Sequence, residues 1–302
     1  YFFPVGSGLI LDEALKANPR RDAASFVAAD EDYFHDMDRD RNGVVQLTPD
    51  EIKGRNTWIA WTAGNDRLWD VLGVTSAGAV DFLKVLSSHR SQYYGRQNRW
   101  EYFGLVNEPC FEKATGPDPN RWGLWLDKRK SDCPADPFEN ATKYPAVKYG
   151  SRGGRLDRKD FDAGSSYGYA TGIVGFRLFP NPNFDASAAS RWDPEKYYTD
   201  PNYAADKDLV KPYRVGMSCG LCHVGPNPIN PPADPNNPEW ANLSSNVGAQ
   251  YFWVDRIFLQ AADFENFAFQ LFHTSRPGSL DTSFVSTDNI NNPRTMNAVY
   301  LL

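Results

Sequence analysis

The sequence predicts a mainly α-helical protein with a high proportion of loop. Apolar residues recur at helical spacing in residues 11–95, and they do so again from Ala249 to Phe272. The loop content follows from 22 proline and 23 glycine residues among 302, because both residue types interrupt regular structure. We therefore divide the chain into a helical N-terminal region (1–97), a loop-rich aromatic region (98–211) and a C-terminal domain (212–302).

The N-terminal region contains three candidate helices. The first spans Asp22–His35, the second Glu51–Leu72 and the third Val80–His89. In the first helix the aromatic residues that point inward are Phe26, Tyr33 and Phe34. The loop-rich region has one good strand candidate, Gly172–Phe179, and we expect its many tryptophan and tyrosine residues to hold long loops in place by burial.

The C-terminal domain contains a C-x-x-C-H motif, Cys219-Gly220-Leu221-Cys222-His223. Residues three apart share a face of a helical turn, so Cys219 and Cys222 can each bond to one vinyl group of the same porphyrin. His223 can then ligate the iron as its proximal ligand. A zinc site would need further soft ligands, and a redox dithiol would need a βαβ pattern around it. The motif therefore predicts covalent haem c and a c-type cytochrome-like haem domain.

Covalent haem attachment implies export, so we expect a periplasmic or secreted bacterial protein with Tyr1 close to its mature N-terminus. Cys110 and Cys133 are then expected to form a disulfide in an oxidising compartment; the alternative is a pair of buried free thiols. The net charge of −6 argues against nucleic-acid binding. The sequence contains no run of 18 or more apolar residues, so it predicts no transmembrane segment.

The predicted helix at 249–272 places Phe252 and Trp253 on its apolar face. These two residues either contact the haem or form ordinary core, and both interpretations can hold together.

The haem propionates need hydrogen-bond donors if they are buried. Arg214 and Arg256 are the nearest basic residues on either side of the motif, and Trp240 offers an indole N–H. The alternative for Arg256 is a surface ion pair with Asp255 or Glu265.

The ligand on the distal face of the iron decides function. His273 follows the predicted long helix, and Met296 lies downstream of the motif as the axial methionine does in small electron-transfer cytochromes. His273 precedes a turn, and Met296 lies in a segment typical of a buried helix. We therefore keep an open or water-bound distal site as a third possibility.

A segment near the N-terminus matches part of a calcium-binding EF-hand loop. Asp38, Asp40 and Asn42 supply oxygens at positions 1, 3 and 5, and Gly43 stands at the turning position 6. Position 12, which should be a bidentate glutamate, is Pro49. Calcium or another hard cation is one interpretation of this segment.

An acidic solvated turn that starts a helix is the other interpretation. Thr48 is a suitable N-cap, Pro49 fits the first helical position, and Glu51 can complete a capping box with Thr48.

Two segments resemble the bacterial dihaem cytochrome c peroxidase superfamily, which includes the MauG-type enzymes and the rubber oxygenases. The first is Gly216–His223, and the second is Asn292–Tyr300, which is similar to the family segment N-x-P-T-x-x-N-A-x-F. The matching residues of the second segment are Asn292, Thr295, Asn297, Ala298 and Tyr300. The resemblance covers the C-terminal domain, while the aromatic loop-rich part is closer in character to the rubber oxygenases.

The resemblance implies that His223 is the proximal ligand of the first haem, where the oxidant reacts. Members of the superfamily carry two C-x-x-C-H motifs, whereas this sequence has one and stops in an apolar run. We therefore expect the sequence to be the N-terminal part of a longer dihaem protein.

Two functions remain open at this point. The first is an enzyme whose open distal site activates peroxide or dioxygen to oxidise a substrate or a redox partner protein. The second is an electron-transfer cytochrome c with six-coordinate iron, ligated by His223 and either Met296 or His273. The lack of a strong distal candidate favours the enzyme, and the single motif favours the carrier.

Overall fold

We describe the fold from a computed structural model, which places residues 29–62, 64–75, 81–144, 167–245, 251–253, 256–257 and 265. The prediction of a mainly α-helical fold is wrong. Among these residues 32% are helical and 17% lie in strands, which form four small antiparallel sheets. Most of the described helices are single turns, because the backbone makes the long-range contacts described below instead of continuing as helix.

The central sheet has three antiparallel strands in the order β5-β6-β7. These are β5 (Tyr169–Ala170), β6 (Phe176–Pro180) and β7 (Tyr213–Met217), and Phe176 lies opposite Met217. Since β5 and β6 come from the predicted loop-rich region and β7 from the predicted C-terminal domain, the sheet joins the two regions. The domain division itself stays a prediction.

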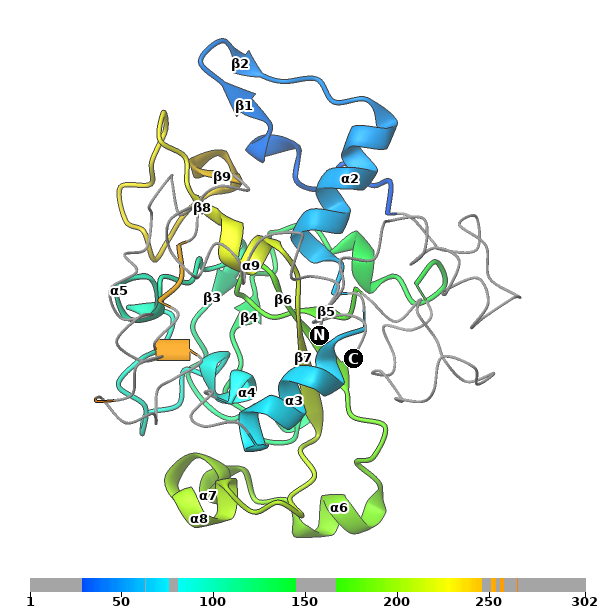
Figure 1. The fold of residues 1–302 in the computed structure, drawn as a ribbon, viewed down its shortest axis with the longest axis vertical. Coiled ribbons are helices and arrows are strands. Elements are labelled where there is room, and N and C mark those ends of the chain that lie inside the picture. Colours follow the sequence, from blue (N-terminus) through cyan, green and yellow to red (C-terminus); the bar gives the residue numbers. More distant parts are fainter. Residues whose placement is uncertain are drawn as a thin grey trace.

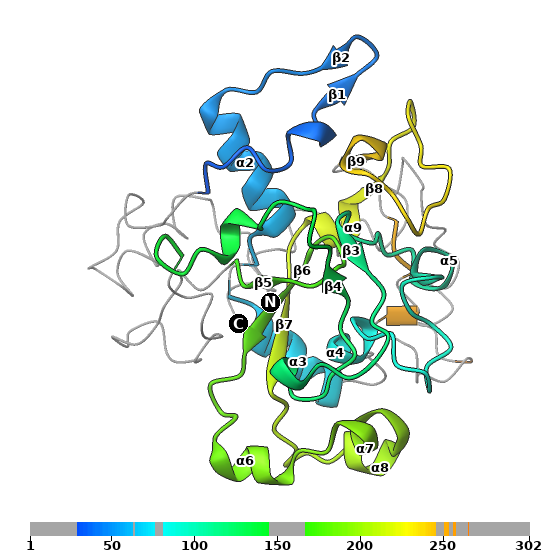
Figure 2. The same ribbon diagram turned by 180° about the vertical axis from the view of Figure 1, so that it is seen from behind.

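The other described strands form two-stranded pairs. They are β1 (Arg39–Asp40) with β2 (Gly43–Val44), β3 (Phe111–Glu112) with β4 (Lys128–Arg129), and β8 (Val224–Pro226) with β9 (Leu243–Ser245). The described α-helices are α2 (Pro49–Ala60), α3 (Asp66–Thr75), α4 (Phe82–Val85), α5 (Arg99–Phe103), α6 (Ala186–Arg191), α7 (Pro194–Thr199), α8 (Pro201–Ala204) and α9 (Gly220–His223). Figures 1 and 2 show α2 and the β1–β2 hairpin at one end of the long axis and α6, α7 and α8 at the other.

The first predicted helix, Asp22–His35, is wrong over its described part. Residues 29–34 are not helical, and a single 3₁₀ turn follows at His35–Met37. The cause is a tertiary contact, because Asn56 of α2 donates to the carbonyls of Ala29 and Glu31 at 2.9 and 2.8 Å. The start of the predicted helix, including Phe26, lies outside the described residues.

The second predicted helix, Glu51–Leu72, is two helices, α2 and α3, separated by residues 61–65. Gly64 in this break has a left-handed φ of +72°. Asn65 then pairs with the backbone of Met217 in β7, accepting from its N–H at 2.9 Å and donating to its carbonyl at 2.8 Å. The third predicted helix is shorter than expected and forms only α4. It ends before Ser88, because Ser88 donates its N–H to the Trp125 carbonyl.

The capping box at the start of α2 is confirmed. Glu51 donates its backbone N–H to the Thr48 hydroxyl at 3.4 Å, and Thr48 returns its own N–H to the Glu51 carboxylate at 2.8 Å. Pro49 occupies the first turn, as predicted.

The strand predicted at Gly172–Phe179 is confirmed in its second half, as β6. Its first half is a tight turn, in which Gly172 and Gly175 have φ angles of +82° and +85°. Most of the helix predicted at 249–272 lies outside the described residues. Within the described part, residues 251–253 are not helical and residues 256–257 are.

The Cys110–Cys133 disulfide is confirmed, with the two Cα atoms 5.7 Å apart. It lies beside the β3–β4 pair, where Lys130 donates its N–H to the Cys110 carbonyl. A disulfide is consistent with the oxidising compartment expected from the sequence. In the part of the chain that the structure describes, no helix is both long and apolar enough to cross a bilayer.

Candidate haem attachment site

The C-x-x-C-H motif follows β7, with Cys219 half-buried at the N-cap and its other four residues buried in one helical turn, α9. The backbone N–H groups of Cys222 and His223 both donate to the Cys219 carbonyl at 3.2 Å. This geometry places Cys219, Cys222 and His223 on the same side of the turn. Neither of the two cysteines is part of a disulfide.

The motif backbone is held between α2 and the turn that precedes β6. Ser218 donates its N–H to the Gly175 carbonyl at 2.8 Å and its hydroxyl to the Ile59 carbonyl at 2.5 Å. Gly175 touches α9 so closely that a Cβ there would lie 2.1 Å from the Leu221 nitrogen. On the other side, a Cβ on Gly220 would lie 3.1 Å from the Ile59 Cα. The position of the turn is therefore set by contacts distant in sequence.

Trp58 of α2 packs against the motif histidine. The Trp58 and His223 ring centroids are 5.4 Å apart, with the planes tilted by 34°. The Trp58 indole N–H donates to the Ser245 hydroxyl at 2.7 Å, and that hydroxyl donates to the His223 carbonyl at 3.2 Å. His223 is 3% exposed. The sequence carried no signal for Trp58, because the contact joins α2 to β9 and α9.

The second thiol lies in an apolar cluster. Cys222, Phe252 and Ile257 belong to the same core cluster, and the latter two are fully buried. The Tyr251 N–H donates to the Cys222 carbonyl at 3.0 Å and ties this segment to α9. Phe252 is therefore part of the core, as one of the two interpretations of the sequence expected, and its contact with a haem stays a prediction. The sequence did not identify Tyr251 as the link to α9. Trp253 is half-buried and donates its N–H to the Phe103 carbonyl at 2.7 Å.

The chemistry of the donor set fits a covalently attached haem. Burial raises the pKa of Cys219 to about 11, and burial also raises the pKa of Cys222. Both thiols are protonated at neutral pH, whereas a redox-active dithiol has a lowered thiol pKa. Within the described ranges, no three His, Cys, Asp or Glu side chains converge to hold a metal ion. Two thiols and an imidazole on one helical turn suit two thioether bonds and one axial ligand.

Arg256 forms hydrogen bonds with the backbone of α5. Its guanidinium donates to the carbonyls of Glu101 and Tyr102 at 3.1 and 2.6 Å. It also lies over the rings of Tyr102 and Trp253, at 5.1 and 4.6 Å from their centroids. Arg256 therefore caps the C-terminal end of α5. Of its alternative partners, Asp255 lies outside the described residues.

The other two predicted propionate donors lie apart from Arg256. Trp240 packs edge-on against Phe34, with ring centroids 5.0 Å apart, at the border of an apolar cluster separate from the one that contains Cys222. Arg214 lies in β7, and its Nε is 3.6 Å from an Asp70 oxygen of α3. The structure does not bring the three donors to one place.

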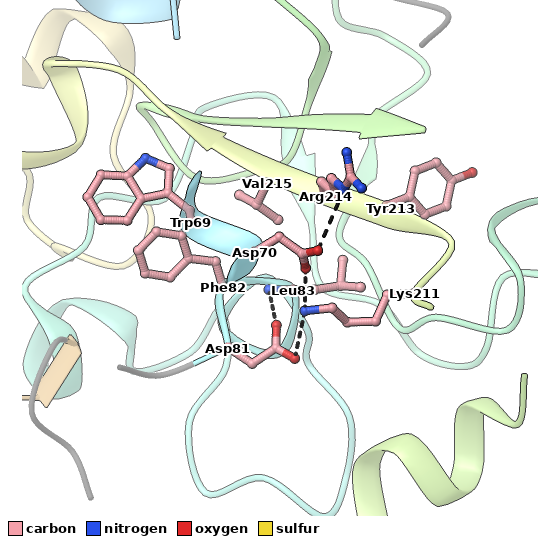
Figure 3. A pocket seen from close by; sticks show the side chains of 9 residues that line it. All are labelled: Trp69, Asp70, Asp81, Phe82, Leu83, Lys211, Tyr213, Arg214 and Val215. Atoms are coloured by element: carbon pink, nitrogen blue, oxygen red, sulfur yellow. Dashed lines mark hydrogen bonds and ion pairs between the residues drawn. The ribbon is translucent and has the colours of Figure 1, made fainter. Parts of the chain in front are cut away.

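Arg214 belongs to a buried group of charges at the α3–α4 side of β7 (Figure 3). Lys211 lies 2.6 Å from Asp70 and 3.4 Å from Asp81, and these side chains line a small pocket. Figure 3 shows both carboxylates pointing toward the Lys211 ammonium. These charges neutralise one another and tie β7 to the neighbouring helices.

A second small pocket contains a buried carboxyl group, Glu108, and is lined in part by Ile59 and Gly175, which contact the motif backbone. Burial raises the pKa of Glu108 to about 7, against the opposing effect of the nearby Arg177 and Arg129 guanidinium groups. The pocket is lined by Phe34, Ile59, Ala60, Glu108, Ile173, Val174, Gly175, Phe176, Arg177 and Trp240. No motif in the sequence singles out Glu108.

The calcium-like segment forms the β1–β2 hairpin. Asp40 accepts the Asn42 N–H at 2.7 Å, which closes the turn, and Asp38 forms an ion pair with Arg55 of α2. Asp38, Asp40 and Asn42 thus have protein partners that explain their positions. Calcium binding there stays a prediction.

The distal candidates His273 and Met296 lie outside the described residues, and so does the second family-like segment, Asn292–Tyr300. No protein-family model, curated protein or solved structure matches the chain. The resemblance to the dihaem peroxidase superfamily therefore stays a prediction that rests on sequence motifs.

Proposed function

We propose that this chain is an exported bacterial c-type haem oxidoreductase, with haem bonded to Cys219 and Cys222 and ligated by His223. One observation carries the proposal. Of the four cysteines, Cys110 and Cys133 form the disulfide, and the other two stand on one buried turn that ends in a buried histidine.

A bound haem, held by Cys219, Cys222 and His223, would supply iron that can react with peroxide or dioxygen. The chain would supply the surroundings of that iron. Trp58 restricts the orientation of the His223 ring. Phe252 and Ile257 belong to the same buried apolar cluster as Cys222, so the surroundings of this thiol are apolar. The molecule that is oxidised would be a substrate or a redox partner protein.

Cysteine variants test the attachment. Each single variant, Cys219→Ala or Cys222→Ala, should leave one thioether, which shifts the absorption of the pyridine complex of the haem. The double variant should be free of haem. The matched control is the Cys110→Ala, Cys133→Ala double variant, which should retain haem. Full haem content in the Cys219→Ala, Cys222→Ala variant would contradict the proposal.

Carbon monoxide separates an enzyme from an electron carrier. An open distal site in the reduced protein should bind carbon monoxide and change the haem spectrum. Variants Met296→Ala and His273→Ala should then have the same spectrum as the unmodified protein. If carbon monoxide binds only after one of these substitutions, the chain is a six-coordinate electron-transfer cytochrome instead.

A further inference from the structure

A group of aromatic side chains runs from α5 to the surface. Tyr93 is 66% exposed, and its hydroxyl lies 2.6 Å from the hydroxyl of Tyr102. The two rings meet edge to face with centroids 5.0 Å apart. Tyr94, which is buried, stacks on Tyr102 at 5.5 Å with an interplanar angle of 17°. The exposed phenol of Tyr93 is thus hydrogen-bonded to the phenol of Tyr102, which is half-buried and packs against the core.

The same group is connected to the haem motif. Tyr251 bonds to the Cys222 carbonyl, and Trp253 follows two residues later. The Arg256 guanidinium lies between the rings of Trp253 and Tyr102, at 4.6 and 5.1 Å from their centroids. In Figure 1 the short segment at 256–257 lies beside α5, in agreement with these contacts. Contacts therefore continue from α9 to the protein surface.

These residue types suit one-electron chemistry. Tyrosine and tryptophan are the side chains that most readily lose a single electron and hold the resulting radical on a ring. A phenol that loses an electron also loses its proton, and the hydrogen bond between Tyr93 and Tyr102 lets a proton move as the electron moves. Because Tyr93 is exposed, the proton finally released from the pair can pass to water.

We propose that Tyr93 is a surface site of one-electron oxidation, connected to the haem site through Tyr102 and Trp253. This inference rests on the function proposed above, with peroxide as the oxidant. Peroxide takes two electrons from the haem site and, with two protons, becomes two waters. Tyr93 returns one electron to that site and releases its phenolic proton to water, which leaves a neutral tyrosyl radical.

The substrate class that fits such a site is a phenol too large to enter the protein. An external phenol gives a hydrogen atom to the Tyr93 radical, which restores the tyrosine and leaves a phenoxyl radical in solution. Two such transfers supply the two electrons and two protons that one peroxide consumes.

Electron paramagnetic resonance of frozen samples tests the proposal directly. The haem-loaded full chain is mixed with hydrogen peroxide and frozen at once, and a tyrosyl radical should be detected. Tyr93→Phe should remove most of this signal, and Tyr102→Phe should reduce it. Tyr169→Phe is the matched control, because Tyr169 is a half-buried tyrosine of β5 that is not among the rings in contact with Tyr93. It should leave the signal unchanged.

Haem content and the spectral reaction with peroxide are measured on the same samples. If haem is present and reacts but Tyr93→Phe keeps the full radical signal, the inference is wrong and the proposed function stands. If no haem is attached, both are wrong. A nitroxide spin trap followed by peptide mass spectrometry gives a second measurement, and the adduct should be on Tyr93.

Discussion

The indole of Trp58 lies against the imidazole of His223, with ring centroids 5.4 Å apart. The indole N–H also reaches the Ser245 hydroxyl, which in turn bonds the His223 carbonyl. Helix α2 therefore fixes the orientation of the proposed proximal ligand from outside the motif. The orientation of that ligand depends on a residue distant in sequence.

Replacing Trp58 separates the ring contact from the hydrogen bond. Trp58→Phe keeps an aromatic ring and loses the N–H donor, which should lower the free energy of unfolding by about 1 kcal/mol. Trp58→Leu also loses the ring pair, worth about 0.5–1.5 kcal/mol more. Urea unfolding of the two variants measures both effects. Equal losses would show that the ring contact with His223 contributes nothing.

Replacing Arg256 tests its contact with α5. Arg256→Leu removes two charge-assisted hydrogen bonds to carbonyls and should destabilise the protein by about 2 kcal/mol. The control is Arg90→Leu, because Arg90 forms an exposed ion pair with Glu195, and such pairs contribute about 0–1 kcal/mol. The haem reduction potential should not change in Arg256→Leu. An upward shift of that potential would instead support a contact between Arg256 and a propionate.

The buried carboxyl of Glu108 predicts a pH dependence of stability. Burial raises its pKa from 4.5 to about 7, so the folded protein keeps this proton over a pH range in which the unfolded chain has lost it. The free energy of unfolding should therefore fall as the pH rises from about 4.5 to about 7. The total fall is on the order of 3 kcal/mol.

Glu108→Gln tests this dependence, because glutamine does not titrate. The variant should match the unmodified protein near pH 4 in urea unfolding and exceed its stability near pH 8. Glu112→Gln, at an exposed position of β3, serves as the control. A fall with pH that persists in Glu108→Gln would assign the effect to another group.

Loss of the disulfide should destabilise the protein without affecting haem attachment. Cys110 and Cys133 are 23 residues apart, and closing a loop of this size is worth about 3 kcal/mol in the chain-entropy model. The double variant to serine should show this loss in urea unfolding. In the denatured, non-reduced and haem-loaded protein, thiol titration should detect no reactive cysteine. Two reactive thiols would contradict the pairing.

The sequence predicted features that depend on near neighbours. The capping box of Thr48 and Glu51, and the turn at Cys219–His223, follow from residues within four positions of one another. The pairing of Cys110 with Cys133 was found by elimination, once the motif had used the other two cysteines.

The predictions were wrong where residues distant in sequence form hydrogen bonds with the backbone groups of a predicted helix. Asn56 takes the carbonyls that the first predicted helix required, and Asn65 pairs with β7 where the second predicted helix was expected to continue. Strand β7 was missed because its pairing partner, β6, lies more than thirty residues earlier. Periodicity reports which face of a segment is apolar, and it does not report such polar contacts.

The candidate site, like the fold, was predicted only in its local features. Its chemical groups, the two thiols and the imidazole, were read from one motif. Their surroundings were not, because Trp58, Tyr251 and Glu108 reach the motif region through tertiary packing. Arg214 was selected for its nearness in sequence, and the structure pairs it with Asp70.

The mass of the intact protein shows directly whether haem is bonded to Cys219 and Cys222. The chain is expressed with export and a c-type haem maturation system, then denatured without reducing agent and weighed. We expect the polypeptide mass plus one haem, with the haem retained on the peptide that contains Cys219 and Cys222. An unmodified polypeptide mass, with both of these cysteines present as free thiols, would contradict it.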